Sequence, residues 1–320
     1  MPIAPPIRRR IARALSNKYK RYSELTQASP IPNFPSRART LKVCLSNIMR
    51  KEEGSFRLEK EIPRIARVLF GIREDISRLK APELPLQEED HILNEQLITL
   101  LDRNLQTKHN GQCKYFGETL LGAYLNAFVT FTTLDADLDF GKNPPFLAYP
   151  LTGGTLELDI LLEDFYLAFE FQGEHHYTDA AVQAKDAFKL ATCATAGKLL
   201  IPVNPYQLSS GSISNLIANS LVDFLGVRDV ICNNYGRQSV PNINRRLKIS
   251  FCKAIQRIYL GKTMFAESLA WLDLRSASYI SGQAIHSPIS ASTSAPRLHM
   301  TGKPDISIEE IYRNLRYISR

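Results

Sequence analysis

Hydrophobic residues recur at helical spacing through the first third of the chain. The segment EEDHILNEQLITLLDRNL, residues 88–105, places its apolar residues on one helical stripe: Ile92, Leu93, Leu97, Leu100 and Leu101. IPRIARVLFGI, residues 62–72, has the same spacing. Residues 41–105 are therefore predicted to be helical. The preceding segment, residues 1–40, contains six prolines and is predicted to be a basic and mostly irregular arm.

The pattern changes to a period of two in two short runs near the middle of the chain. LELDILL (156–162) and YLAFEFQ (166–172) alternate and are rich in residues that favour strands. YFGETLLGAYL, before them, has the pattern of a helix, and AKDAFKLATCATAGKLLIPV, after them, predicts a helix and then a strand. We therefore expect residues 106–226 to form an α/β core, with a mixed sheet flanked by helices.

The last part of the chain, residues 227–320, is predicted to be helical and basic. PNINRRLKISFCKAIQRIYLGKTMFAESLAWL has the pattern of a basic amphipathic helix, and the Ser-rich stretch SGQAIHSPISASTSAP reads as a linker. ISIEEIYRNLRYI predicts a short final helix. The sequence thus predicts an α/β core with helical extensions on both sides.

Two acids stand opposite one another in the predicted hairpin. If a two-residue loop joins the strands, Asp159 lies directly opposite Glu170, and both share one sheet face with Gln172. A buried unpaired carboxylate costs on the order of several kcal/mol, and two of them repel one another. A divalent cation with oxygen ligands, Mg²⁺ or Mn²⁺, relieves this repulsion most simply. The alternative is that both acids point to solvent from a half-exposed sheet.

The charge is concentrated at one end of the chain. The formal net charge is +8, and residues 1–50 hold eleven Lys or Arg against a single acid, Glu24. Such a segment suits polyanion binding, because Lys and Arg at phosphates release condensed counterions. RRRIARALSNKYKR is also Arg-rich like a mitochondrial presequence and basic enough for nuclear import. The sequence alone leaves these three interpretations open.

Composition disfavours two classes of protein. No apolar run reaches the roughly 18–20 residues of a membrane span, and the N-terminus lacks the apolar core of a secretory signal. The five cysteines show no CxxC spacing, which argues against a zinc cage or a disulfide framework. We expect a soluble intracellular protein, in the nucleus or mitochondrion if the basic N-terminus is an address.

The residues at and after the hairpin form an ordered set: Asp159, Glu170, Gln172, Gly173, His176 and Tyr177. This set resembles the PD-(D/E)xK restriction-endonuclease-like superfamily, in the ExQ variant of Vsr-like and homing-type nucleases. The resemblance covers residues 112–206. It implies a restriction-endonuclease-like core in which a helix, a hairpin, a second helix and a parallel closing strand follow one another. Gln172 replaces the usual catalytic lysine, and Leu158 replaces the usual proline before the first Asp.

The resemblance also implies roles for individual residues. A Mg²⁺ or Mn²⁺ ion would be held by four groups: Asp159, Glu170, Glu118 and the backbone carbonyl of Phe171. Gln172 would position the attacking water. Lys189 or Lys185, on the following helix, would replace the missing lysine, and Lys189 shares a helix face with Asp186 at i, i+3 spacing.

Contacts to a nucleic acid are expected from two further sets of residues. His176 and Lys185 lie near the predicted metal site, although His176 has the alternative role of packing at the strand exit. Arg245, Arg246 and Lys248 belong to the basic C-terminal segment and would contact phosphates, unless they form the solvated face of an amphipathic helix.

The sequence therefore predicts a metal-dependent endonuclease that hydrolyses phosphodiester bonds, in DNA more than in RNA. The alternative is a module on the same fold that binds nucleic acid without cleaving it, as RAP-type RNA-binding domains do. The sequence is compatible with a homodimer but sets no oligomeric state.

Overall fold

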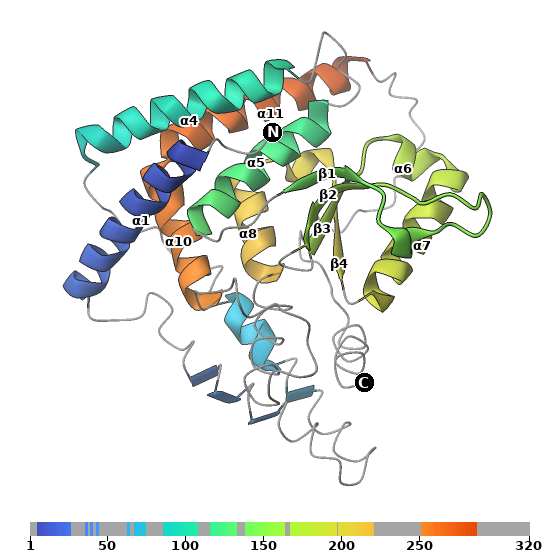
Figure 1. Cartoon of the computed structure of the whole chain (residues 1–320), viewed down its shortest axis with the longest axis horizontal. Coiled ribbons are helices and arrows are strands. Elements are labelled where there is room, and N and C mark those ends of the chain that lie inside the picture. The colour runs from blue at the N-terminus through green and yellow to red at the C-terminus, as the bar shows by residue number, and fades with distance from the viewer. Residues whose placement is uncertain are drawn as a thin grey trace.

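The computed structural model describes residues 5–26, 36–37, 39–40, 43–44, 63–64, 67–74, 86–107, 116–132, 138–163, 167–196, 198–220 and 251–286. These residues form a small mixed sheet with helices on both of its faces (Figure 1). The fold is therefore α+β and rich in helix, which confirms the predicted mixed sheet flanked by helices. Among the described residues, no helix combines the length and apolar character needed to cross a membrane.

The sheet has four strands in the order β1-β2-β3-β4: Asp139–Lys142, Leu158–Leu162, Leu167–Phe171 and Leu199–Val203. β2 is antiparallel to both of its neighbours, β1 and β3, whereas β4 is parallel to β3. A parallel neighbour requires a crossover, which α6 (His175–Thr178) and α7 (Ala180–Thr195) supply. β2 and β3 pair Leu162 with Leu167, which is the register predicted for a two-residue loop.

Helices bury the side of the sheet that faces the main core. α5 (Phe116–Thr132) and α8 (Ser210–Ser220) cover this face, because Ile160 and Phe169 project toward them and join their apolar residues in one cluster (Figure 1). Strands that are apolar on both faces are typical of sheets covered by helices.

A second, smaller cluster covers the opposite face of the sheet. Leu161 and Ala168 are buried there against Cys193 of α7 and against Leu147. Leu147 ends the short 3-10 helix η2 (Pro145–Leu147). This is also the face on which Glu170 projects, since it lies two residues after Ala168.

α5 is the central helix of the larger cluster. Almost all of its residues are buried, because α1 (Pro5–Thr26), α4 (Glu88–Thr107), α10 (Phe251–Met264) and α11 (Ala266–His286) pack around it. α10 approaches so closely that a side chain at Gly261 would collide with Phe131. The core of the protein therefore includes segments from both ends of the described chain.

A helix occupies residues 5–26 of the segment 1–40, in which we expected an irregular arm. α1 spans Pro5–Thr26, with its prolines in the first turn, where the missing N–H groups remove no helical hydrogen bond. Ile11 and Leu15 are fully buried in the main core. Lys18 forms an ion pair at 2.9 Å with Asp90 of α4, which is almost fully buried. The prolines misled the prediction because they stand where a helix tolerates them.

The C-terminal helices also belong to the core rather than to a basic surface. α10 buries apolar residues along its length: Ala254, Ile255, Ile258 and Leu260. α11 continues to His286 and so includes the start of the stretch predicted to be a linker. The predicted final helix lies outside the described residues, as do Arg245, Arg246 and Lys248.

Candidate active site at the end of the hairpin

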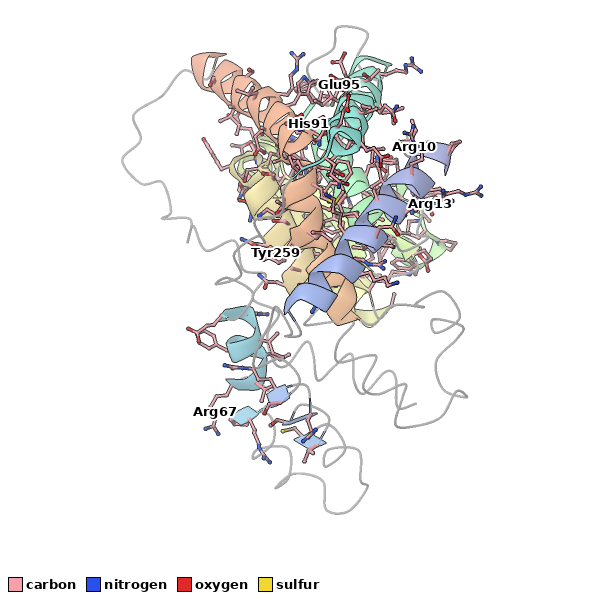
Figure 2. The ribbon with its side chains drawn as sticks, turned by 90° about the vertical axis from the view of Figure 1, so that its left-hand side faces the viewer. Arg10, Arg13, Arg67, His91, Glu95 and Tyr259 are labelled. Carbon is pink, nitrogen blue, oxygen red and sulfur yellow. The ribbon has the colours of Figure 1, made fainter. Side chains whose placement is uncertain are left out.

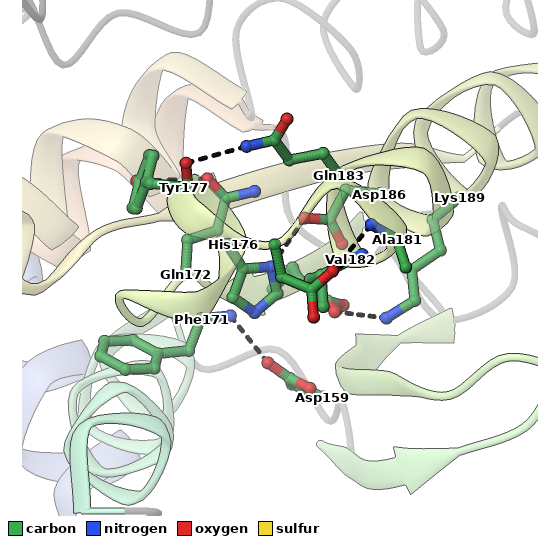
Figure 3. Close-up of polar contacts among 12 residues, drawn as sticks. Asp159, Phe171, Gln172, His176, Tyr177, Ala181, Val182, Gln183, Asp186 and Lys189 are labelled. Carbon is green, nitrogen blue, oxygen red and sulfur yellow. Dashed lines mark hydrogen bonds and ion pairs between the residues drawn. The ribbon is translucent and has the colours of Figure 1, made fainter.

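The hairpin brings Asp159 and Glu170 together at one end of the sheet. β2 and β3 pair Leu161 with Ala168, and two residue pairs further along the same register Asp159 lies opposite Glu170, as predicted. Asp159 turns back onto β3, where its Oδ2 accepts a hydrogen bond of 2.7 Å from the amide of Phe171 (Figure 3). Glu170 is only 4% exposed. The two acids therefore do not point to solvent from a half-exposed sheet.

α7 supplies the counter-charge for this pair. Lys189 donates from Nζ to Oε1 of Glu170, and both side chains are largely buried. α7 is held at its first turn by Asp179, whose Oδ1 accepts from the amide of Ala181 at 2.7 Å. The lysine expected to replace the missing one is thus brought to the acid pair. Lys185, in contrast, is exposed to solvent.

Burial raises the pKa of both acids, and repulsion by Asp159 adds to the rise for Glu170. The pKa of Glu170 rises to about 7, first because burial removes water from the carboxylate and second because Asp159 repels its charge, against the attraction of Lys189. Burial likewise raises the pKa of Asp159, while the hydrogen bond from Phe171 and the charge of Lys189 oppose the shift. Lys189 and the amide of Phe171 therefore stabilise the negative charge of the two carboxylates only in part.

One oxygen of this pair lacks a partner. Oε2 of Glu170 is buried and accepts no hydrogen bond within the described structure, although such groups are nearly always satisfied. With Asp186, which adds to the repulsion on Glu170, the cluster holds three carboxylates against one ammonium. Its formal excess is two negative charges when His176 is neutral. Carboxylate oxygens with this excess fit a hard divalent cation such as Mg²⁺.

The described residues contain no group of three or more His, Cys, Asp or Glu side chains that could hold a metal ion. Glu118, the expected third carboxylate, lies half-buried in the first turn of α5 and is not gathered into such a group with Asp159 and Glu170. α5 nevertheless begins beside the site, since a side chain at Gly117 would collide with the ring of Phe171. The contact that Phe171 makes with Asp159 is through its N–H, whereas we expected its carbonyl to serve as a ligand.

Gln172 does not face the acid pair as predicted. Its Oε1 accepts a hydrogen bond of 3.3 Å from the hydroxyl of Tyr177, and Figure 3 shows the side chain directed toward that residue, away from Asp159. β3 ends at Phe171, so the alternation of side chains cannot be extended to the next residue. Tyr177 is itself 45% exposed. The role of Gln172 in positioning water has no support in this arrangement.

His176 lies between two acids. Its Nδ1 is 2.6 Å from Oδ2 of Asp186 on α7, and the ring is largely buried (Figure 3). A positive charge on His176 would also lower the pKa of Asp159. Asp186 was recognised in the sequence only as a neighbour of Lys189 on one helix face. The i, i+3 spacing to Lys189 was the sequence signal for Asp186, but that spacing does not show that His176 is the partner of Asp186.

Comparisons with known proteins give no relative for this chain. No protein-family model matches it, and neither the curated proteins nor the solved structures contain a significant match.

Proposed function

We propose that the protein is a metal-dependent nuclease with a PD-(D/E)xK type of site at the end of the hairpin. The observation that carries the proposal is the Asp159–Glu170 pair, opposed on adjacent strands, in which Asp159 is half-buried and Glu170 is buried with one oxygen unsatisfied. The order of elements supports it, because α5, the hairpin, α7 and a parallel β4 follow one another as the resemblance implies.

In this proposal each charged group of the site has a chemical role. Asp159 and Glu170 hold the cation. Such an ion, when bound, supplies a Lewis acid for the phosphoryl oxygen and activates a water. Lys189 balances Glu170 and places a positive charge beside the phosphate, which stabilises negative charge developing on it. His176 lies at the edge of the cluster, where a phosphate or the leaving oxygen would be contacted.

The basic surface of α1 supports a polyanionic substrate. Arg9, Arg10 and Arg13 are exposed, and Figure 2 shows Arg10 and Arg13 on the outer side of this helix. Of the three interpretations of the N-terminal segment, a cleaved presequence fits least, because removal of α1 would expose Ile11 and Leu15. Of the two that are left, phosphate binding is the one we propose. DNA is the favoured substrate.

The test is cleavage of plasmid DNA and of structured RNA by the purified protein with Mg²⁺ or Mn²⁺. We expect cleavage that requires the ion and that Asp159→Asn abolishes. The control is Asp139→Asn, which removes an acid from β1 that pairs with a surface lysine, Lys142, at 3.3 Å. Cleavage should persist in the control, and cleavage that also persists in Asp159→Asn would discard the site.

A second candidate is a module that binds nucleic acid without cleaving it. The pairing of Glu170 with Lys189 favours this candidate, because part of the charge is already balanced without a metal. Calorimetric titration with Mg²⁺ distinguishes the two. Binding of nucleic acid with no heat of metal binding, and with no loss of binding in Asp159→Asn, supports the module.

A further inference from the structure

A histidine and an aspartate that come from different helices are joined beside the proposed site. His176 belongs to the one-turn helix α6, and Asp186 lies in the second turn of α7. Their side chains are 9% and 18% exposed, and Nδ1 lies 2.6 Å from Oδ2. A contact this short and this sheltered has the geometry of a charge-assisted hydrogen bond. It fixes the orientation of the imidazole ring.

The hydrogen bond also decides which nitrogen of the ring carries the proton. An ionised carboxylate only accepts, so Asp186 requires a proton on Nδ1 of His176. Nε2 is then left on the other side of the ring. Figure 3 draws the ring of His176 between Asp186 and Asp159. The nitrogen that is not bound to Asp186 is therefore the one available to the acid pair and to a phosphate there.

We propose that Asp186 is a positioning residue, which holds His176 as the Nδ1–H tautomer with Nε2 presented to the Asp159–Glu170 site. The proposal rests on the proposed nuclease function as far as the consequence for cleavage is concerned. In that reaction Nε2 is the atom of His176 that contacts the phosphate or the leaving oxygen. Asp186 acts only through His176 and touches no substrate.

A purely structural role is the competing explanation, since the same contact fastens α6 to α7. The two explanations differ in what they predict for the ring. If Asp186 only fastens the helices, a variant that keeps a hydrogen bond at this position leaves the tautomer of His176 unchanged. If Asp186 selects the tautomer, Asp186→Asn changes it, because the amide can donate to Nδ1 as well as accept from it.

The experiment is ¹⁵N NMR of the imidazole side chains in the full chain, without nucleic acid or metal. His176 is assigned from the signals lost in His176→Gln. We expect the wild-type protein to show His176 with its proton on Nδ1, and Asp186→Asn to shift the ring largely to the Nε2–H form. Asp179→Asn is the matched control, because it removes an acid from the start of the same helix and keeps an oxygen that can cap it. An unprotonated Nδ1 in the wild type, or no shift in Asp186→Asn, overturns the proposal.

Cleavage assays add a second readout. We expect Asp186→Asn to lower kcat by about 10- to 100-fold, with KM changed less than threefold, as for other residues that orient a functional group through one hydrogen bond. Asp186→Glu should restore part of the loss, and Asp186→Asn should cost nothing further in a His176→Gln background. Equal kcat in Asp186→Asn and wild type would contradict the consequence for cleavage.

The two proposals fail in different ways. If the wild-type protein cleaves no substrate, the nuclease function fails, and the NMR result alone decides whether Asp186 positions His176. If the wild type cleaves but the tautomer and kcat are the same in Asp186→Asn, the inference about Asp186 is wrong and the nuclease function stands.

Discussion

Lys189 of α7 pairs with one oxygen of Glu170 in β3, while the other oxygen of that carboxylate is buried without a hydrogen-bond partner in the described structure. From the sequence we expected a metal ion to balance the negative charge of the two carboxylates, but Lys189 already balances part of it. The pair connects the crossover helix to the sheet at the point where both proposed metal ligands lie. Its charge balance leads to the first three predictions.

Lys189→Met should destabilise the metal-free protein strongly at pH 8. It leaves Glu170 as a buried and uncompensated charge, and loss of one partner of a buried pair costs about 3–5 kcal/mol. Urea denaturation at pH 8 measures the change in the free energy of unfolding. Lys185→Met serves as the control, because Lys185 is exposed on the same helix. Equal effects of the two substitutions would mean that the ion pair contributes nothing specific.

The stability of the metal-free protein should depend on the protonation of Glu170. Its pKa is raised from 4.5 to about 7 in the folded state, so the folded state binds the proton more tightly. The contribution of Glu170 to stability is then complete below pH 4.5 and is lost as the pH rises through about 7. We expect the wild type to lose stability relative to Glu170→Gln across this window, in denaturation curves at half-unit pH steps. A constant difference between the two proteins would contradict the raised pKa.

Asp159→Asn should make the metal-free protein more stable by about 1 kcal/mol at pH 8. Asparagine keeps an acceptor for the amide of Phe171 but removes the charge that repels Glu170. The same substitution should abolish the rise in melting temperature that Mg²⁺ produces in the wild type, since a ligand that binds only the folded state stabilises it. Thermal unfolding with and without 5–10 mM Mg²⁺, on the order used for weak sites, measures both effects. A normal response to Mg²⁺ in the variant would remove Asp159 from the metal site.

Gly117→Ala should destabilise the protein by about 1–3 kcal/mol, the usual cost of overpacking. The added Cβ would collide with the ring of Phe171, which follows Glu170 in the strand. Gly211→Ala is the matched control, because a Cβ there meets no atom within 4 Å. Chemical denaturation compares the two variants. If Gly117→Ala is as stable as the control, the start of α5 does not pack against the end of β3 as described.

Leu15→Ala should cost about 2–5 kcal/mol of stability, as expected for a fully buried leucine. Arg13→Ala, two residues earlier on the exposed side of α1, should change stability by less than about 0.5 kcal/mol. Arg13→Ala should instead weaken binding of DNA at low salt. A small effect of Leu15→Ala on the unfolding free energy would mean that α1 is a detachable arm rather than part of the core.

The sequence was sufficient to predict the hairpin but not the length of the loop that sets its register. The alternation of LELDILL and YLAFEFQ and the short spacing between them predict paired strands, and a two-residue loop would place Asp159 opposite Glu170, whereas a three-residue loop would place them on opposite faces. The pairing of Leu162 with Leu167 is the register of the two-residue loop. The mixed sheet flanked by helices follows from the same local pattern. These features depend on local sequence patterns, so they could be predicted from the sequence alone.

Other features depend on how distant segments pack, and only the tertiary structure decided them. The i, i+3 spacing puts Asp186 and Lys189 on one face of α7. The orientation of that helix over the sheet brings Asp186 to His176 and Lys189 to Glu170. The same holds for α1 and α10, whose basic residues suggested surface segments. Their apolar faces are buried because α5 is apolar all round and must be covered on every side, a requirement that no local pattern in α1 or α10 reveals.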